Sequence, residues 1–245
     1  MSDAPTLAFN VESRIFNATD GGLLHAVDNL LFNVAKQSFT CIVGPSGCGK
    51  TTTLRMILGL DTGYRGSIEV TGDGPVSVVF QEPRLLPWRT VAQNVELVLN
   101  QRKPSIPLDE LFDKLGLTAV KDFFPAELSL GLARRAALAR AFVVAPDLLV
   151  LDEPFVSLDD DTAQRLRRVL ITMLESHPTT TLMVTHNLRE AALLADTVLV
   201  FSERPATLRA EITIDTPRSE RDTATINSIV DRIVSASDGQ VSNVP

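Results

Sequence analysis

The chain has 245 residues, and its 23 Lys and Arg against 30 Asp and Glu give a formal net charge of −7. With 44% apolar, 22% charged and 5% aromatic residues, the composition is that of a globular protein, long enough for one large domain or two small ones. An acidic chain without a block of Lys and Arg is a poor candidate for broad nucleic-acid binding, because neutralising phosphates takes clustered positive charge. No apolar run approaches the roughly 20 residues that span a bilayer as a helix.

The start of the chain and the cysteine count both favour a cytoplasmic protein. The opening Met1-Ser-Asp-Ala-Pro has neither the basic nor the apolar part of a secretory signal. Two cysteines in a chain of this length do not form a disulfide framework. We therefore expect a soluble cytoplasmic protein, which would act at a membrane only by docking onto a partner that spans it.

The first third of the chain carries strand patterns around one helix pattern. Strands are expected at residues 6–11, 39–43, 67–71 and 75–80. Residues 39–43 are an apolar run that ends at Gly44, which is typical of a buried strand, and residues 51–60 have helical spacing. Asp20, Gly21 and Gly22 indicate a turn.

The composition changes at about residue 82, where prolines separate three helical patterns. These helices are expected at residues 91–100, 108–116 and 128–144, which predicts a helical subdomain inserted at about 82–145. Strands and helices then alternate again. Strands are expected at 147–151, 180–185 and 197–201, and helices at 160–175 and 188–194. This alternation predicts an α/β fold with a mainly parallel sheet.

The C-terminal residues form a separate pattern. Five apolar residues lie at helical spacing: Ile226, Ile229, Val230, Ile233 and Val234. They predict one face of a short helix, with Asp222 or Thr223 as its N-cap. We favour packing of this face on the domain's own core over binding to a partner. We divide the chain into a domain at 1–220 and a C-terminal helix with a frayed tail at 221–245, the fraying from residue 237 onward.

The most specific motif is Gly44-Pro-Ser-Gly-Cys-Gly-Lys50-Thr51-Thr52, which follows a predicted strand and opens a predicted helix. Its glycines let the backbone wrap around phosphate groups, and the helix N-terminus adds positive potential. Lys50 can then reach the β- and γ-phosphates, and the Thr51 hydroxyl can bind Mg²⁺. The nucleotide-binding candidates here are Gly44, Pro45, Ser46, Gly47, Cys48, Gly49, Lys50, Thr51 and Thr52.

Two adjacent carboxylates end the apolar run that starts at Leu148. Asp152 stands at the strand end, where it suits a ligand to Mg²⁺, and Glu153 is placed to polarise a water for attack on the γ-phosphate. An Asp-Glu pair after a strand is by itself a common solvated turn. With the phosphate-binding motif in the same chain, the pair favours a nucleotide-hydrolysing site.

The order of these motifs resembles the nucleotide-binding subunits of ATP-binding cassette (ABC) transporters. Gln81 matches the family's Q-loop glutamine, and His186 matches the switch histidine that contacts the γ-phosphate. Residues 128–132 stand at the signature motif, and residues 157–159 match the D-loop. Phe16 lies where the family places an aromatic ring that stacks on adenine.

This resemblance implies a fold, cofactors and a composite site. The fold would be a P-loop NTPase cassette, with an antiparallel β part at the N-terminus and an inserted helical subdomain. The cofactors would be ATP and Mg²⁺. Catalysis would fall to Glu153, His186, Gln81 and Lys50, and the metal ligands would be Thr51, Gln81 and Asp152. Two cassettes, expected to be copies of one chain, would pack head to tail so that Ser129 and Gly131 of one complete the ATP site of the other.

One position departs from the family's signature pattern. Leu130 replaces the first glycine of Leu-Ser-Gly-Gly, and Leu132 ends the motif. We expect Leu130 to be unfavourable, because leucine resists positive φ and would stand where backbone approaches phosphate. Slow turnover, or a nucleotide-sensing module that does not hydrolyse ATP, therefore stays open.

The branch of the family is indicated by residues 80–91 and 212–218, which resemble the importers for nitrate, sulfonates and taurine. That branch implies an ATPase subunit on the cytoplasmic face of the inner membrane, with membrane-spanning permease subunits and an extracytoplasmic solute-binding protein as partners. An exporter or lipid-trafficking cassette and a soluble ABC protein of DNA repair or translation remain alternatives. Trp88, the single tryptophan, would either border the groove for the permease or fill a subdomain interface.

The two cysteines have different expected environments. Cys41 falls within the strand predicted at 39–43 and should be inert core. Cys48 falls within the phosphate-binding motif, where we expect a thiol alkylator to inactivate the protein and ATP to protect it.

Overall fold

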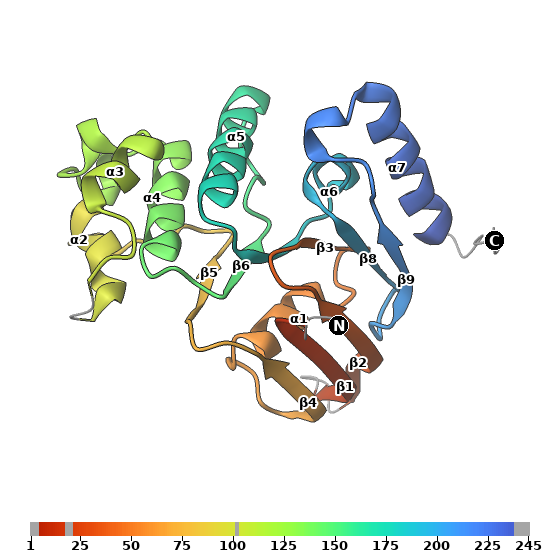
Figure 1. Ribbon diagram of the computed structural model, residues 1–245. Coiled ribbons are helices and arrows are strands. Elements are labelled where there is room, and N and C mark those ends of the chain that lie inside the picture. The colour runs from red at the N-terminus through yellow and green to blue at the C-terminus, as the bar shows by residue number, and fades with distance from the viewer. Residues whose placement is uncertain (1–4, 18–21, 101–102, 238–245) are drawn as a thin grey trace. The chain divides into compact units, whose positions relative to one another are not determined.

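The computed structural model describes residues 5–17, 22–100 and 103–237 (Figure 1). The opening residues 1–4, most of the turn expected at 20–22 and the tail from residue 238 lie outside the described residues. The chain divides into two compact units. The first unit comprises Met1–Gly72 and Thr180–Pro245, and the second comprises Asp73–Thr179. Each unit is described on its own below.

An antiparallel sheet in the order β2-β1-β4 opens the first unit. Its strands are β1 (Leu7–Asn17), β2 (Leu23–Val34) and β4 (Tyr64–Val70). Phe9 of β1 and Phe32 of β2 face each other across the pair and stack with ring centroids 4.7 Å apart. Both rings are buried, so this contact is part of the apolar core on which the sheet rests.

A second sheet of the same unit is largely parallel. Its strands are β3 (Phe39–Val43), β7 (Thr180–Val184), β8 (Thr197–Phe201) and β9 (Leu208–Thr213). β3 runs parallel to both β7 and β8, and β9 pairs antiparallel with β8. Every residue of β3 and β7 is buried, as expected for strands covered on both faces. The phosphate-binding motif therefore starts from a buried strand of this sheet.

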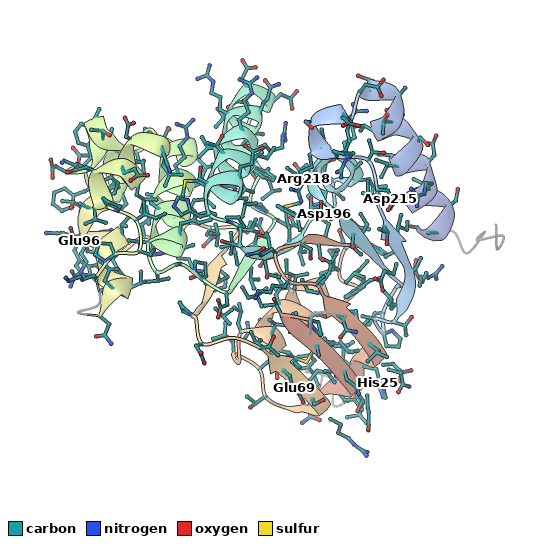
Figure 2. All side chains as sticks on the ribbon, viewed as in Figure 1. His25, Glu69, Glu96, Asp196, Asp215 and Arg218 are labelled. Carbon is teal, nitrogen blue, oxygen red and sulfur yellow. The ribbon has the colours of Figure 1, made fainter. Side chains whose placement is uncertain are left out.

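An ion pair fixes the first residue of β3. The Asp196 carboxylate accepts hydrogen bonds from the Phe39 backbone N–H (2.8 Å) and from Arg218 Nη2 (2.6 Å). Figure 2 labels Asp196 and Arg218, which lie close together. Arg218 also donates from Nε to the Leu194 carbonyl, so one charged pair ties together the start of β3, the end of a helix and the segment after β9.

The helices of the first unit are α1 (Lys50–Ile57), α6 (Leu188–Leu194), the short η4 (Arg218–Glu220) and α7 (Thr223–Ser237). The apolar face predicted for the last helix is confirmed, since Ile226, Ile229 and Ile233 are buried and α7 packs on α6, β8 and β9. Figure 1 shows α7 lying along β9. Val234, also assigned to this face, is instead 42% exposed.

The second unit holds two parallel strands and a group of helices. The strands are β5 (Val76–Val79) and β6 (Leu148–Asp152), which pair in parallel. The α-helices are α2 (Val91–Glu96), α3 (Leu108–Lys114), α4 (Leu130–Phe142) and α5 (Asp160–Ser176). The segments between α2 and α4 also contain three short 3-10 helices: η1 (Leu97–Leu99), η2 (Thr118–Val120) and η3 (Pro125–Glu127). α4 packs against both α2 and α5, so it is central to this unit.

The α/β fold class is confirmed, but two strands were not predicted from the sequence. β2 lacks a regular alternation, because Asn29 adopts a left-handed conformation (φ 45°) in its middle and the pairing with β1 shifts register at Arg14 and Ile15. β9 carries charged residues and buries only Ile212, as an edge strand often does. Among the described residues, no helix is both long enough and apolar enough to cross a membrane.

The cap of α7 predicts a pH-dependent stability. The Asp222 carboxylate accepts a hydrogen bond from the Thr225 N–H (2.8 Å), and this bond lowers the pKa of Asp222. A lowered folded-state pKa stabilises the fold above the unfolded pKa, and this stabilisation is lost as the pH falls through the folded pKa. We expect Asp222→Ala to lower the unfolding temperature at pH 7, with a difference from wild type that shrinks below about pH 4.

Thermal unfolding followed by circular dichroism between pH 3 and pH 8 measures this difference. Asp222→Asn is the matched control, because it keeps an oxygen acceptor for the Thr225 N–H but carries no charge. A gap between wild type and Asp222→Ala that is equally large at pH 3 and pH 7 would contradict the role of the charged cap.

Candidate active site

The phosphate-binding motif, residues 44–52, forms a tight loop between β3 and α1. Gly47 (φ 76°) and Gly49 (φ 120°) adopt conformations that favour glycine. A Cβ at Gly49 would lie 2.9 Å from the Ala26 carbonyl oxygen, which is backbone and cannot turn aside. The loop therefore closes against the strand β2 only because this position has no side chain.

Lys50 lies beneath this loop and is 6% exposed. Its ammonium donates to the carbonyl oxygens of Gly44 (2.7 Å) and Pro45 (2.8 Å). Carbonyls offer only partial negative charge, so the site has a buried positive charge that an anion would complement. Arg204 adds a second cation at the loop, since its Nη2 donates to the Gly47 carbonyl (2.6 Å).

The outer face of the loop is open to solvent. Pro45, Ser46, Gly47 and Thr51 are exposed, whereas Thr52 is half-buried. α1 has no side-chain N-cap, so the first N–H groups of the helix are available to an anionic ligand. The structure thus places the motif between a strand and a helix, as the sequence predicts, and within it Lys50 is buried while the outer residues are exposed.

His186 lies at the same end of the parallel sheet as this loop. The Thr185 N–H donates to the Ile42 carbonyl (3.2 Å), which places the backbone of His186 beside the end of β3. The Thr185 hydroxyl donates to the Glu190 carboxylate (2.7 Å) and accepts from the Asn187 N–H (3.0 Å). This small network holds the turn that presents the exposed His186 side chain.

Phe16 lies near the end of β1 with its ring half-buried. The Arg14 guanidinium covers one face of the ring at 3.8 Å from its centroid. Arg14 is itself held by a salt bridge to Asp61 (2.9 Å), whose side chain is 8% exposed. The charged pair of Arg14 and Asp61 therefore holds one face of the ring, and the sequence alone did not predict this pair.

In the second unit, the residues that follow the two parallel strands come together. Val79 of β5 pairs with Leu151 of β6, so Gln81 and Asp152 lie at the same, carboxyl-terminal end of the two parallel strands. Gln81 is exposed, and Asp152 and Glu153 are half-buried. Glu153 adopts a left-handed conformation (φ 45°), which is rare for a residue with a side chain. Oxygen atoms are the ligands that Mg²⁺ prefers, and at this end of the strand pair Asp152 offers a carboxylate and Gln81 an amide oxygen.

The signature segment differs from the sequence-based expectation. Ser129 is the N-cap of α4, and its hydroxyl accepts from the Leu132 N–H (3.3 Å). Leu130 is the first residue of this helix and is 41% exposed. The expectation of a strained backbone at Leu130 is wrong, because neither Leu130 nor Gly131 has a positive φ. The first position of a helix accepts leucine without backbone strain.

Gly131 is required for packing rather than for backbone conformation. A Cβ at this position would lie 2.6 Å from Thr162 Cγ2, on the neighbouring helix α5. The D-loop residue Asp159 caps α5 by accepting from the Thr162 N–H (2.9 Å), which lowers the pKa of Asp159. The signature segment therefore packs against the first turn of α5, which Asp159 caps, with no room for a side chain at Gly131.

The two cysteines are both buried. Burial raises the pKa of the Cys41 thiol well above its usual range, in agreement with the predicted inert core position. Cys48 is only 1% exposed, with its sulfur 3.9 Å from Lys50 Nζ. Ready attack by an alkylating reagent is not expected for a thiol this inaccessible, so the structure opposes the alkylation expected from the sequence.

Comparison with known proteins adds a family and a fold. A family model described as ABC transporter matches residues 27–156. The aliphatic sulfonates import ATP-binding protein SsuB 2 of Burkholderia lata is 46% identical over 200 residues, covering 77% of this chain and 72% of that protein. SsuB 1 of Pseudomonas syringae pv. syringae is 40% identical over 202 residues, covering 82% of this chain and 84% of that protein. The dimeric post-hydrolysis structure of the ATP-binding cassette MJ0796 with ADP and Pi has a TM-score of 0.72 at 23% identity, covering 86% of this chain and all of that one.

The contact between Gly131 and Thr162 predicts that a substitution at Gly131 destabilises the fold and that a second substitution at Thr162 restores stability. Gly131→Ala should destabilise the fold by about 1–3 kcal/mol, because the added methyl group overpacks the α4–α5 contact. Thr162→Ser removes the clashing Cγ2 and keeps the backbone N–H that Asp159 caps, so the double variant should recover most of the loss. Urea unfolding of the two single variants and the double variant measures this coupling. Additive effects in the double variant would contradict the assigned contact.

Proposed function

Because this chain belongs to the ABC transporter family, as an ATP-hydrolysing cassette of its importer branch, we propose that it powers the uptake of aliphatic sulfonates. The observation that carries the solute class is the name shared by relatives from Burkholderia and Pseudomonas at 38–46% identity, all aliphatic sulfonates import ATP-binding proteins. The exporter alternative has no comparable support. The nucleotide-sensing alternative rested on the bulk of Leu130 and on its resistance to a positive φ, and Leu130 has no positive φ.

The phosphate loop is proposed to hold the nucleotide triphosphate. Its backbone N–H groups and the N-terminus of α1 would bind the phosphate oxygens, and Lys50 would turn from its carbonyl partners toward the β- and γ-phosphates. Phe16, supported by Arg14, would stack on adenine. Thr51, Gln81 and Asp152 would hold Mg²⁺, which supplies positive charge to the γ-phosphate.

Hydrolysis is then proposed to depend on two side chains. Glu153 would accept a proton from the attacking water, since a carboxylate at a strand end can act as a general base. His186, on a turn fixed by Thr185 and Glu190, would donate to the γ-phosphate. A second copy of the chain would contribute Ser129 and Gly131, at the N-terminus of its helix α4. Phosphoryl transfer in such a site is mostly positioning and electrostatics.

The proposed permease contact is the loop of the second unit that carries Trp88. Trp88 is 69% exposed, so it does not fill an interior interface. The buried Asn94 side chain holds its loop by accepting from the Leu86 N–H (2.7 Å) and donating to the carbonyls of Leu86, Arg89 and Thr90. An exposed aromatic on a rigid loop suits an interface anchor. We propose that Trp88 contacts a membrane-spanning subunit, and that an extracytoplasmic binding protein delivers the solute.

The role of Glu153 predicts a stalled ATP complex. Glu153→Gln removes the proposed base but keeps the size of the side chain, so it should bind ATP normally and hydrolyse it at least a hundredfold more slowly. Without turnover, the ATP-bound pair of chains should accumulate. Size-exclusion chromatography with Mg²⁺-ATP, alongside steady-state phosphate release, measures both effects. Lys50→Ala is the control, because it should lose ATP binding and form no dimer. Wild-type turnover in Glu153→Gln would remove this residue from its role.

Partner binding predicts the result of a pull-down from native membranes in mild detergent. A polytopic membrane protein should co-purify in near-equal amount with the wild-type chain and in smaller amount with Trp88→Ala. In proteoliposomes with that partner and its binding protein, an alkanesulfonate should stimulate ATP hydrolysis more than nitrate does. Phe123→Ala is the matched control for loss of an exposed aromatic, since Phe123 is 43% exposed. Co-purification of soluble proteins alone would refute the transporter role, and stimulation by nitrate alone would refute the solute.

A further inference from the structure

The loop that follows β6 has an unusual backbone. Glu153 (φ 45°) and Ser157 (φ 61°) both adopt left-handed conformations, although neither is glycine. Such conformations are unfavourable for residues with a side chain and persist only where the surroundings hold them. The residue proposed as general base is therefore held in a conformation that its own backbone does not favour.

The carbonyl groups of residues 153–156 show what holds this loop. The Glu153 carbonyl accepts from the Val156 N–H (3.3 Å), and the Phe155 carbonyl accepts from the Leu158 N–H (3.4 Å). The carbonyls that follow each of these in the chain, on Pro154 and Val156, both accept from Arg134. Backbone N–H groups within the loop thus bond the carbonyls of Glu153 and Phe155, and the Arg134 side chain bonds those of Pro154 and Val156.

Arg134 is built into the helix that starts at the signature segment. It belongs to α4, is 3% exposed and donates to Pro154 from Nη1 and to Val156 from Nη2. A guanidinium presents its N–H donors in a fixed plane, so one arginine can bridge two carbonyls with a defined separation. An ammonium and an amide each donate from a single nitrogen, so neither fixes two carbonyls at a defined separation as the guanidinium plane does.

The same arrangement recurs at the other loop of this unit. Arg140, six residues further along α4, donates to the carbonyls of Pro83 and Arg84, both at 2.8 Å. Arg84 again has a positive φ (48°), and its guanidinium stacks on Phe80 at 3.9 Å, next to Gln81. The helix α4 therefore holds both loops that carry the proposed catalytic side chains of the second unit.

We propose that Arg134 is a positioning residue for hydrolysis, which holds the left-handed backbone of residues 153–157 so that the Glu153 carboxylate faces the attacking water. This inference rests on the proposed role of Glu153 as general base. It places a determinant of turnover on the signature helix, outside the residues that touch the nucleotide.

The test separates turnover from binding. Arg134→Met keeps a long side chain but removes both hydrogen bonds, and it should lower kcat by about ten- to a hundredfold, as expected when a catalytic group is displaced by about 1 Å. The Kd for ATP should stay within about twofold of wild type. Arg134→Gln can donate to one carbonyl and should give an intermediate kcat, which also keeps the test available if Arg134→Met does not fold. Arg135→Met is the matched control on the same helix, because Arg135 makes a long hydrogen bond to Leu115 (3.4 Å).

A double-variant cycle shows whether Arg134 acts through Glu153. In single-turnover assays, Arg134→Met combined with Glu153→Gln should be no slower than Glu153→Gln alone, because the positioned group is already missing. Losses that multiply in the double variant, a raised Kd with unchanged kcat, or wild-type turnover in Arg134→Met would each overturn the proposal. If Glu153→Gln itself keeps wild-type turnover, the proposed role of Glu153 fails instead, and the two failures are distinguished.

Discussion

The buried charge of Lys50 is the constraint on which the first unit depends. An ammonium that is 6% exposed needs partners, and the carbonyls of Gly44 and Pro45 supply them in the structure described here. Those carbonyls can face inward only because the loop turns sharply at Gly47 and Gly49. The loop can turn there only because Gly49 leaves room for the Ala26 carbonyl. A phosphate group carries full negative charge where these carbonyls carry only partial charge. The geometry that stabilises the Lys50 ammonium therefore also favours the binding of an anion.

A comparable constraint shapes the second unit, where backbone carbonyls rather than a charge need partners. The loops after β5 and β6 each contain a non-glycine residue at positive φ, and each receives a pair of hydrogen bonds from an arginine of α4. Burial lowers the pKa of Arg140, whose side chain is half-buried. Because both arginines belong to one helix, the loops carrying Gln81 and Glu153 have a common support. The N-terminus of that helix is the signature segment.

The apolar surfaces of the chain divide between internal packing and partner binding. The C-terminal helix α7 buries Ile226, Ile229 and Ile233 within its own unit, so its main apolar face is already occupied. Trp88 remains exposed although Asn94 fixes its loop with several hydrogen bonds. An aromatic side chain has few rotatable bonds, and on a loop that is already fixed it loses little further entropy on binding. This is the physical reason to assign Trp88, rather than α7, to the contact with a membrane-spanning partner.

The sequence by itself determined the elements that follow local rules. The buried run at 39–43, the helix at 188–194 and the phosphate-binding motif each depend on residues adjacent in the chain, and the structure has them as predicted. The family followed from the order of short motifs, and the comparisons confirm it.

Tertiary structure decided what depends on neighbours distant in sequence. Asn29 interrupts the alternation of β2, so only pairing with β1 identifies that strand. Leu130 was expected to be strained, but as the first residue of α4 it has an ordinary conformation. The lack of space for a side chain at Gly131 comes from Thr162, 31 residues away. Arg134 gave no local signal at all, because the carbonyls that it bridges come together with it only in the folded chain.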